Sequence, residues 1–366
     1  MAQRSSYEIL RVWDVLRTQQ LESLPEMTAG RLVYNSERYD FSASYLDPLT
    51  MMRQSGPETV RTILRGDYDR LELNEPTMIH LWRRLVPYAL AFRVVRIRAN
   101  LSNRESPLLV LYAIDNFDVR SAYIKRGLGP AKLRGWVFDH VFRGLVRNID
   151  RVAFGTPGAA ETYQTLVGRT LRHTETKMFP RLDHSCQCGD PDKDPDLVLF
   201  VGALDDRKGV IPLMGAWQPV LNQRSTTRLV IIGKGEHRDL VEQWAEDRPE
   251  VTFIFDPERA EIHRWYRIAR TVVLLSQPHT RWREQVGLPI TEGLSHGCVI
   301  VTTTETGVAG WLVEHGHSVI SPDASKEDTA KAVCAALDSV SSASDVLAEL
   351  PDESTRITAD RWLMRP

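Results

Sequence analysis

Five short apolar runs in the second half of the chain, separated by stretches of helical character, constrain its fold more than any other feature. Each run is rich in aliphatic residues and is bounded by glycine or polar turns, which is typical of buried strands. The repeated strand–helix order predicts a parallel sheet with helices on both faces, and hence an α/β fold. The predicted strands are 197–201, 227–235, 251–255, 271–275 and 299–302.

Polar residues follow the first and the fourth of these strands. Arg207 and Lys208 come after 197–201, and Glu284 lies in the loop after 271–275. In parallel sheets, ligands bind beyond the carboxyl ends of the strands. We therefore expect both loops to lie at the ligand-binding edge of this domain.

The loop with Glu284 runs into a helix predicted to start at 289, within the sequence RWREQVGLPITEGLSHG (281–297). Pro289 suits the first helical position because its missing N–H would have no partner there. The free N–H groups and the dipole of a helix start favour a phosphate group. Glu284 and Glu292 can only accept hydrogen bonds, so they suit ribose and sugar hydroxyls. The spacing alone also fits a capped surface helix with two solvated glutamates.

Three sequences, FVGALDDRKG, LVIIGKG and EQVGLPITEGLSHG, occur in this order in the second half. Over roughly 196–337 the chain resembles the donor domain of the retaining family-4 glycosyltransferases, which have the GT-B fold. The resemblance implies two Rossmann-like α/β domains that face each other across a cleft. The expected parts are an acceptor-side domain at 1–181, a polar linker at 182–196, a nucleotide-sugar donor domain at 197–345 and a tail at 346–366 that crosses back to the first domain.

The resemblance also implies roles for charged residues. Lys208 and Arg207 would neutralise the donor diphosphate. Glu292 would hold the ribose hydroxyls, and Glu284 would hold the transferred sugar. Many members of the family carry arginine directly after the glycine that ends the first strand, whereas this chain has Ala203 there. Arg207 is the candidate to supply that charge.

Backbone groups are expected to contribute as well. By the same resemblance, the amides of Gly287 and Leu288 would lie against the sugar–phosphate linkage. Gly202 and Gly235 follow the first two strands and would border the nucleotide.

The implied reaction is transfer of a sugar from a nucleoside diphosphate sugar to an acceptor hydroxyl, with the anomeric configuration retained. Charge builds up on the departing diphosphate, so fixed positive groups lower the barrier without a metal ion or another cofactor. The donor is a co-substrate of undetermined UDP or GDP type. A glycan, a lipid, a protein, a natural product or a modified nucleic acid remains open as acceptor. Two alternatives also remain open: a GT-B sugar-nucleotide epimerase, and a non-catalytic scaffold that binds nucleotide sugars.

The first half of the chain predicts a second α/β domain. Its candidate strands are 7–12, 31–34, 70–73, 108–113 and 151–154. Asp115 follows the fourth of them, where the family often keeps a His or Asp near the reacting sugar. Asp115 therefore either orients the sugar or the acceptor, or simply forms a turn at the strand end.

Two segments of the first half, 79–97 and 134–147, mix aromatic residues with arginine. Contact with an anionic membrane surface and core helices with arginine edges both fit this pattern. The chain begins without a signal-peptide pattern and contains no apolar run long enough to span a membrane. We expect a cytoplasmic protein, either free or bound at the inner membrane surface.

The four cysteines predict no metal site. Cys298 and Cys334 stand in apolar surroundings, which favours buried thiols. His184, Cys186 and Cys188 lie in a polar loop, but a zinc site would need more ligands at a suitable spacing. The halves carry net charges of only +5 (1–195) and −7 (196–366), which does not indicate binding to nucleic acid.

Overall fold

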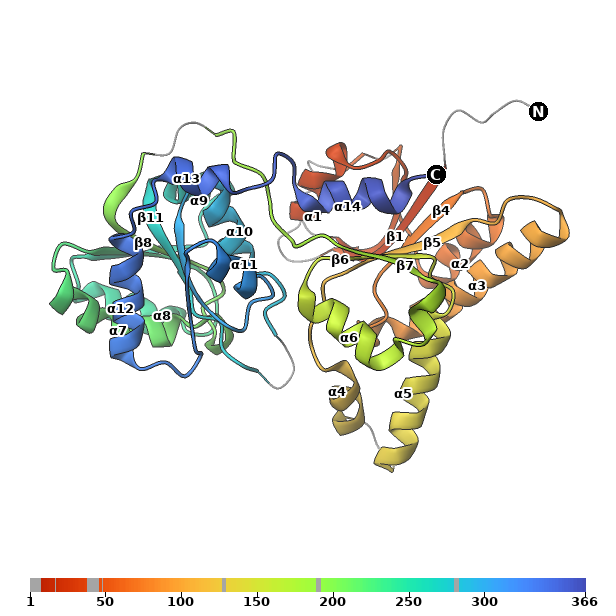
Figure 1. Cartoon of the computed structure of the whole chain (residues 1–366), viewed down its shortest axis with the longest axis horizontal. Helices are drawn as coiled ribbons and strands as arrows, with labels where there is room; N and C mark the ends of the chain where they lie inside the picture. Colours follow the sequence, from red (N-terminus) through yellow and green to blue (C-terminus); the bar gives the residue numbers. More distant parts are fainter. Residues whose placement is uncertain are drawn as a thin grey trace. The chain divides into compact units, whose positions relative to one another are not determined.

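The computed structural model describes residues 8–16, 18–37, 46–47, 49–126, 130–188, 192–279 and 283–366. The chain divides into two compact units. In Figure 1 the first is coloured red to yellow-green with a blue carboxyl-terminal helix, and the second is coloured green to blue. The first comprises Met1–Phe179 together with Arg356–Pro366, and the second comprises Pro180–Thr355. No helix within the described ranges is long and apolar enough to cross a membrane.

The first unit contains a seven-stranded sheet whose paired strands are all parallel, in the order β3-β2-β1-β4-β5-β6-β7. Its strands are β1 (Ile9–Leu16), β2 (Arg31–Glu37), β3 (Met51–Arg53), β4 (Arg70–Leu73), β5 (Leu108–Ala113), β6 (Arg151–Phe154) and β7 (Glu175–Met178). Its helices are α1 (Thr18–Ser23), α2 (Gly56–Arg65), α3 (Trp82–Leu101), α4 (Val119–Arg126), α5 (Ala131–Val146), α6 (Pro157–Val167) and α14 (Thr355–Met364).

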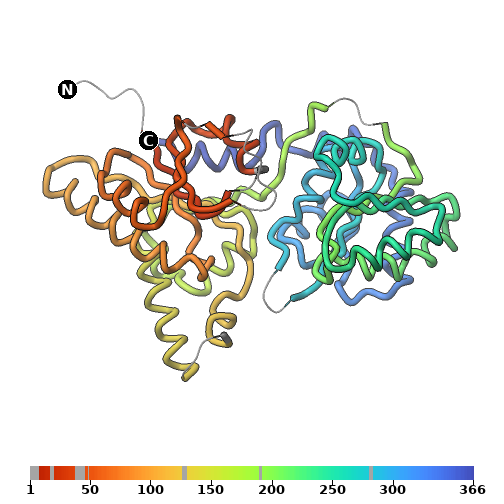
Figure 2. Tube along the Cα trace, turned by 180° about the vertical axis from the view of Figure 1, so that it is seen from behind, coloured from red at the N-terminus to blue at the C-terminus, as the bar shows by residue number. Residues whose placement is uncertain are grey.

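Helices cover both faces of this sheet because its strands are apolar on both sides. Successive side chains of a strand point to opposite faces. Leu10 of β1 packs with α2, α3, α5 and α6, whereas its neighbour Ile9 packs with Leu363 of α14. Figure 2 shows the blue carboxyl-terminal helix lying against the red strands of the first unit. The end of the chain thus completes the core of the first unit.

A buried ionic network holds α14 in place. Arg11 Nη2 lies 2.7 Å from Asp360 Oδ1, and Arg11 Nε lies 3.2 Å from Glu72 Oε2. Arg356 Nη2 lies 2.7 Å from the other oxygen of Glu72, and the N–H of Thr28 donates to Asp360 at 2.7 Å. Buried charges are stable only when they are paired and hydrogen-bonded, so these partners depend on one another.

The second unit contains a six-stranded parallel sheet in the order β10-β9-β8-β11-β12-β13. Its strands are β8 (Asp194–Val201), β9 (Arg228–Gly233), β10 (Val251–Phe255), β11 (Ala269–Leu274), β12 (Val299–Thr303) and β13 (Ser318–Ile320). Its helices are α7 (Val210–Gln223), α8 (Arg238–Glu246), α9 (Arg259–Ile268), α10 (Leu288–Ser295), α11 (Ala309–Glu314), α12 (Lys326–Leu337) and α13 (Ala343–Ala348).

Every strand predicted from the sequence overlaps an observed one, and three strands were not predicted. The missed strands β3, β7 and β13 are three or four residues long and stand at the edges of their sheets. Edge strands bury little apolar surface, and β7 is exposed along its whole length, so they lack the apolar run that marks a central strand. Strand β8 begins at Asp194 and therefore includes the last residues of the predicted linker.

Candidate functional site

The turn after β8 has a conformation fixed by its own residues. Asp205 Oδ1 accepts hydrogen bonds from the backbone N–H groups of Arg207 (3.1 Å) and Lys208 (3.2 Å) in the short 3₁₀ helix Asp206–Lys208. Gly209 has φ = 76°, and a Cβ there would lie 1.9 Å from the carbonyl oxygen of Leu275. Only glycine fits that close approach. The turn is thereby packed against the end of β11.

Lys208 and Glu284, predicted from separate motifs, are in direct contact. Lys208 Nζ forms an ion pair with Glu284 Oε2, and the Ser276 hydroxyl donates to the same oxygen at 3.2 Å. The two charged side chains are only 16% and 8% exposed. A cation and a carboxylate are therefore held together beyond the carboxyl ends of β8 and β11, the edge at which the sequence analysis expected both loops.

Arg207 turns toward a partner that the sequence analysis missed. Its Nε lies 3.1 Å from Asp205 Oδ2, and Nη2 contacts the same oxygen. Asp205 thus both caps the turn and pairs with Arg207. Each of the two predicted cations has a carboxylate partner within its own site.

The helix start after Glu284 lies within one residue of its predicted position. Helix α10 begins at Leu288, and Gly287 with φ = 78° precedes it as N-cap. The loop before it is fastened by the Thr306 hydroxyl, which donates to the carbonyl of Val286 at 2.7 Å. The first residues of the motif, Arg281 and Trp282, lie outside the described residues.

Glu292 lies in the second turn of α10 and is also paired. Its Oε1 lies 2.8 Å from Arg259 Nη2 at the start of α9, and its side chain is 13% exposed. Sequence reasoning missed Arg259, which stands alone in an ordinary helical pattern. Glu292 is therefore held by α9, separately from the pair of Lys208 and Glu284.

The loops after β8 and β9 pack backbone against backbone. A Cβ on Gly235 would lie 2.4 Å from the carbonyl oxygen of Leu204, and one on Gly233 would lie 1.9 Å from the carbonyl oxygen of Gly202. Gly202 itself has room, since a Cβ there would meet only ordinary contacts at 3.6 Å or more. The close approach therefore requires Gly233 and Gly235 rather than Gly202.

In the first unit, Asp115 lies beside a buried carboxyl group that the sequence analysis missed. Glu75 Oε1, after β4, accepts hydrogen bonds from the N–H groups of Ile114 (3.3 Å) and Asp115 (3.2 Å). Burial, and next the Asp115 carboxylate, raise the pKa of Glu75 to about 8. The side chain of Asp115 accepts from the N–H of Phe117 at 3.3 Å, as in a turn. Glu75 thus holds the loop that presents Asp115.

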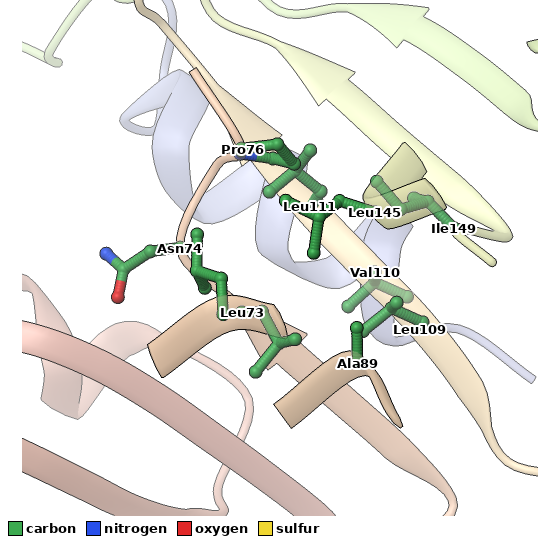
Figure 3. A pocket seen from close by; sticks show the side chains of 10 residues that line it. Leu73, Asn74, Pro76, Ala89, Leu109, Val110, Leu111, Leu145 and Ile149 are labelled. Carbon is green, nitrogen blue, oxygen red and sulfur yellow. The ribbon is translucent and has the colours of Figure 1, made fainter. Parts of the chain in front are cut away.

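A small cavity lies in the core of the first unit, next to β4 and β5 (Figure 3). Its volume of about 20 Å³ is close to that of one water molecule. Its lining is mostly aliphatic, and Asn74 contributes the one polar side chain among the lining residues. The cavity contains none of the predicted site residues and is too small for a sugar or a nucleotide.

Sequence comparisons with known proteins concern mainly the second unit. Residues 188–346 match the family model described as Glycosyl transferases group 1. A search of curated protein sequences gave no match. The matched segment contains the predicted site residues of the second unit, from Gly202 to Glu292.

Solved structures share the fold over almost the whole chain at low identity. The lipopolysaccharide outer core galactosyltransferase WaaB, in its apo form, has a TM-score of 0.67 at 10% identity and covers 97% of this chain and 98% of its own. An α,α-trehalose-phosphate synthase from Burkholderia xenovorans, solved with glucose-6-phosphate, gives 0.63 at 13% identity, covering 98% and 99%. The Anabaena protein HepE, solved with UDP-glucose, gives 0.58 at 14%, covering 98% and 96%.

The family match and the fold match support the same conclusion. They confirm the resemblance drawn from the three sequence motifs and the α/β architecture that it implied. Residues 188–346 of the second unit thus resemble the group 1 glycosyltransferases in sequence, and the chain as a whole has the GT-B fold shared by the solved glycosyltransferases.

Proposed function

We propose that the protein transfers a sugar from a nucleoside diphosphate sugar to an acceptor hydroxyl and retains the anomeric configuration. The contact between Lys208 and Glu284 is the observation that carries this proposal. The Lys208 ammonium stabilises the negative charge that develops on the departing diphosphate. Glu284, fixed by Ser276, accepts hydrogen bonds from hydroxyls of the sugar.

The other predicted residues complete the proposed site. Arg207 supplies a second positive charge to the diphosphate when it exchanges Asp205 for a phosphate oxygen. The amides at Gly287 and Leu288 face the sugar–phosphate linkage at the start of α10, where the helix dipole favours an anion. Glu292 accepts from the ribose hydroxyls. In this proposal these groups act without a metal ion or another cofactor.

Asp115 is our candidate in the first unit for orienting the acceptor or the transferred sugar. The loop that carries it is held by Glu75. We name no protein nucleophile, because the acceptor hydroxyl attacks and gives its proton to the leaving diphosphate. The nucleotide of the donor is UDP or GDP, and UDP-glucose is the first compound to test because HepE was solved with it.

A thermal-shift series with UDP, GDP and their common sugar conjugates tests the donor site. A ligand that binds only the folded chain raises the melting temperature in proportion to RT ln(1 + [L]/Kd). We expect one diphosphate to stabilise the wild type and not Lys208→Ala. Lys331→Ala, at an exposed position of α12, is the matched control and should respond like the wild type. A wild type that no nucleotide stabilises would contradict the proposal.

Product analysis separates transfer from the two alternatives. Retaining transfer gives a glycoside with the anomeric configuration of the donor, which NMR coupling constants report. An epimerase would convert the nucleotide sugar without any acceptor. A scaffold protein would bind the donor and neither transfer nor hydrolyse the sugar.

We further propose that α3 lies on an anionic membrane surface. Leu90, Val94, Ile97 and Leu101 recur at helical spacing and are 39–82% exposed. Arg83 and Arg98, which are also exposed on α3, flank this apolar stripe at helical spacing. Apolar residues flanked by arginine suit the boundary of a membrane rich in anionic lipids, as on the cytoplasmic leaflet.

Sedimentation with lipid vesicles tests this contact. Anionic vesicles should retain the wild type and release the double variant Leu90→Ser with Ile97→Ser. Val313→Ser, at an exposed position of the second unit, is the control. If anionic vesicles retain the double variant as well as they retain the control, this stripe is not the membrane contact. If only neutral vesicles retain the wild type, anionic lipids have no role in binding.

A further inference from the structure

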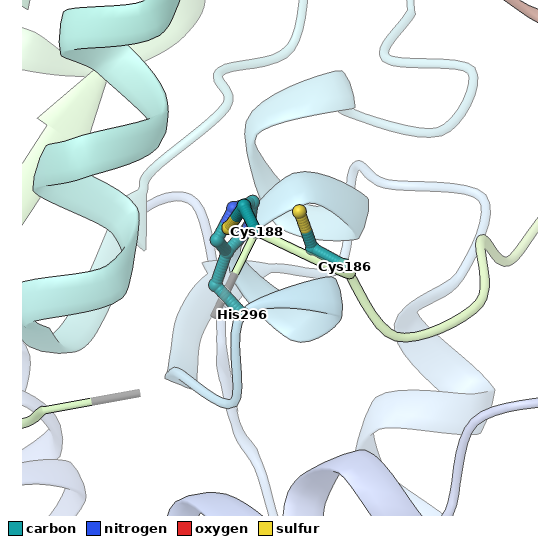
Figure 4. Close-up of side chains that lie close together, drawn as sticks. All are labelled: Cys186, Cys188 and His296. Carbon is teal, nitrogen blue, oxygen red and sulfur yellow. The ribbon is translucent and has the colours of Figure 1, made fainter. Parts of the chain in front are cut away.

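Two cysteines of the segment that opens the second unit lie against the end of α10. Figure 4 shows Cys186 and Cys188 beside the ring of His296, and their ligand atoms all lie within 4.8 Å of one another. The N–H of Cys186 donates to the carbonyl of Ser295 at 2.7 Å. Arg267 Nη1 donates to the carbonyl of Cys188 at 2.7 Å. The backbone is thus fastened at both cysteines, and the three side chains are held together.

The ring of His296 has a defined tautomer. Its Nδ1 lies 2.6 Å from the carbonyl oxygen of Glu292, which can only accept, so Nδ1 carries the hydrogen. The other nitrogen, Nε2, therefore carries a lone pair in the neutral ring. Histidine ligands of metals commonly donate their second ring N–H to a carbonyl in this way. His296 is also buried, which protects a bound ion from water.

A second histidine lies next to that lone pair. His263 Nδ1, from α9, is 3.2 Å from His296 Nε2. Two nitrogen ligands on a tetrahedral zinc ion stand about 3.3 Å apart, since each Zn–N bond is about 2.0–2.1 Å. The two rings can therefore either share a hydrogen bond or hold one metal ion between them.

We propose that Cys186, Cys188 and His296 bind a zinc ion or a similar soft divalent cation, with His263 as the fourth ligand. Thiolate and imidazole ligands favour such cations over calcium or magnesium. Two sulfur ligands of zinc stand about 3.8 Å apart, so the two cysteine sulfurs, which lie within 4.8 Å of each other, need to close by no more than about 1 Å. His263 is outside that group, so its ring must turn further toward the sulfurs. Binding releases the proton of each thiol to solvent, and the thiolates then bond to the metal.

The sequence analysis predicted no metal site because it counted only the residues of one loop. His184 is not part of the cluster, and His263 and His296 come from helices far along the chain. A bound ion would fix the segment that leads out of the first unit to the end of α10. The same helix carries Glu292 and begins at Gly287, so the metal would stabilise the helix from behind the proposed donor site.

Cobalt binding by the full-length, tag-free, reduced chain tests the proposal. We expect one Co²⁺ per chain, with the intense visible bands of tetrahedral thiolate-bound cobalt, and displacement by Zn²⁺. Cys188→Ser should lose these bands, and its exposed position leaves the fold intact. Cys334→Ser removes a thiol from another part of the unit and should bind cobalt like the wild type.

Melting curves provide a second readout that does not depend on the spectrum. Chelation should lower the melting temperature of the zinc-loaded wild type and leave that of Cys188→Ser unchanged. A reduced wild type that shows no cobalt bands would overturn the proposal. Equal cobalt binding by Cys188→Ser would do the same, as would a pair of cysteines found joined as a disulfide that binds no metal after reduction.

Discussion

The two units present their candidate residues in different ways. In the second unit, Lys208 and Glu284 lie in loops of fixed shape, and their motifs are recognisable in the sequence. In the first unit, Asp115 depends on Glu75, a buried carboxyl group with no motif around it. The candidate donor site can thus be recognised from local sequence, whereas the candidate acceptor-side site is defined by contacts between distant strands.

The units also differ in what holds them together. The second unit contains one continuous apolar core around its sheet. The first unit needs the carboxyl-terminal helix α14 for one face of its sheet and secures it with buried charges. We therefore expect the stability of the first unit to be sensitive to removal of buried charges. The stability of the second unit should be sensitive to replacement of the glycines that allow close backbone contacts. The following variants test this difference.

The largest effect should come from Asp360→Ala. This change leaves Arg11 buried without one of its two carboxylate partners, which costs about 3–5 kcal/mol of stability. Hydrogen–deuterium exchange should show the loss in the first unit and little change in the second. Asp323→Ala, at an exposed position of the second unit, is the control and should change neither. Equal loosening of both units would show that they do not unfold separately.

Lys208→Ala should be the most damaging change to catalysis. Removing one group that stabilises the leaving diphosphate is expected to lower kcat about 100- to 1,000-fold. Circular dichroism should show that the variant still folds, because Glu284 keeps its hydrogen bond from Ser276 when Lys208 is removed. Steady-state kinetics with Lys331→Ala as control measure the effect. A change in KM alone would mean that Lys208 binds the donor without stabilising the transition state.

Gly209→Ala and Gly202→Ala form a matched pair in the second unit. A methyl group at 209 would collide with the carbonyl of Leu275, and the left-handed backbone there also disfavours alanine. We expect a cost of about 2–4 kcal/mol at 209 and less than about 0.5 kcal/mol at 202. Urea unfolding of both variants gives the difference. Equal costs would mean that the turn can shift away from β11.

Features were predictable where neighbouring residues in the sequence mark them. The central strands and the start of α10 were predictable because apolar runs, a proline and a glycine mark them locally. The position of Lys208 and Glu284 at one edge of the sheet was predictable because both residues follow strand ends. Their direct contact was not predicted. The edge strands β3, β7 and β13 were missed because they bury too little surface to leave a pattern.

Partners on other elements were missed for a related reason. Two of the missed partners are single residues on α9: Arg259, which contacts Glu292, and His263, which contacts His296. The residues around them in the sequence do not indicate these contacts. Glu75 looked like any polar residue after a strand, and only packing shows that it is buried. These sites are formed by tertiary contacts between residues far apart in the chain, and such contacts cannot be inferred from a single sequence.

The smallest expected effect, taken per pH unit, concerns Glu75. Burial raises its pKa from 4.5 to about 8, so between these values the folded chain keeps a proton that the unfolded chain has released. Stability of the first unit should therefore fall as the pH rises from about 4.5 to about 8, by at most about 1.4 kcal/mol per pH unit. Urea unfolding at several pH values should show this slope in the wild type and lose it in Glu75→Gln. Glu161→Gln, at an exposed position of α6, should keep the slope. If Glu75→Gln keeps the slope too, the proton resides on another group of the first unit. The pairing of Glu75 with Asp115 then no longer distinguishes this unit from the second.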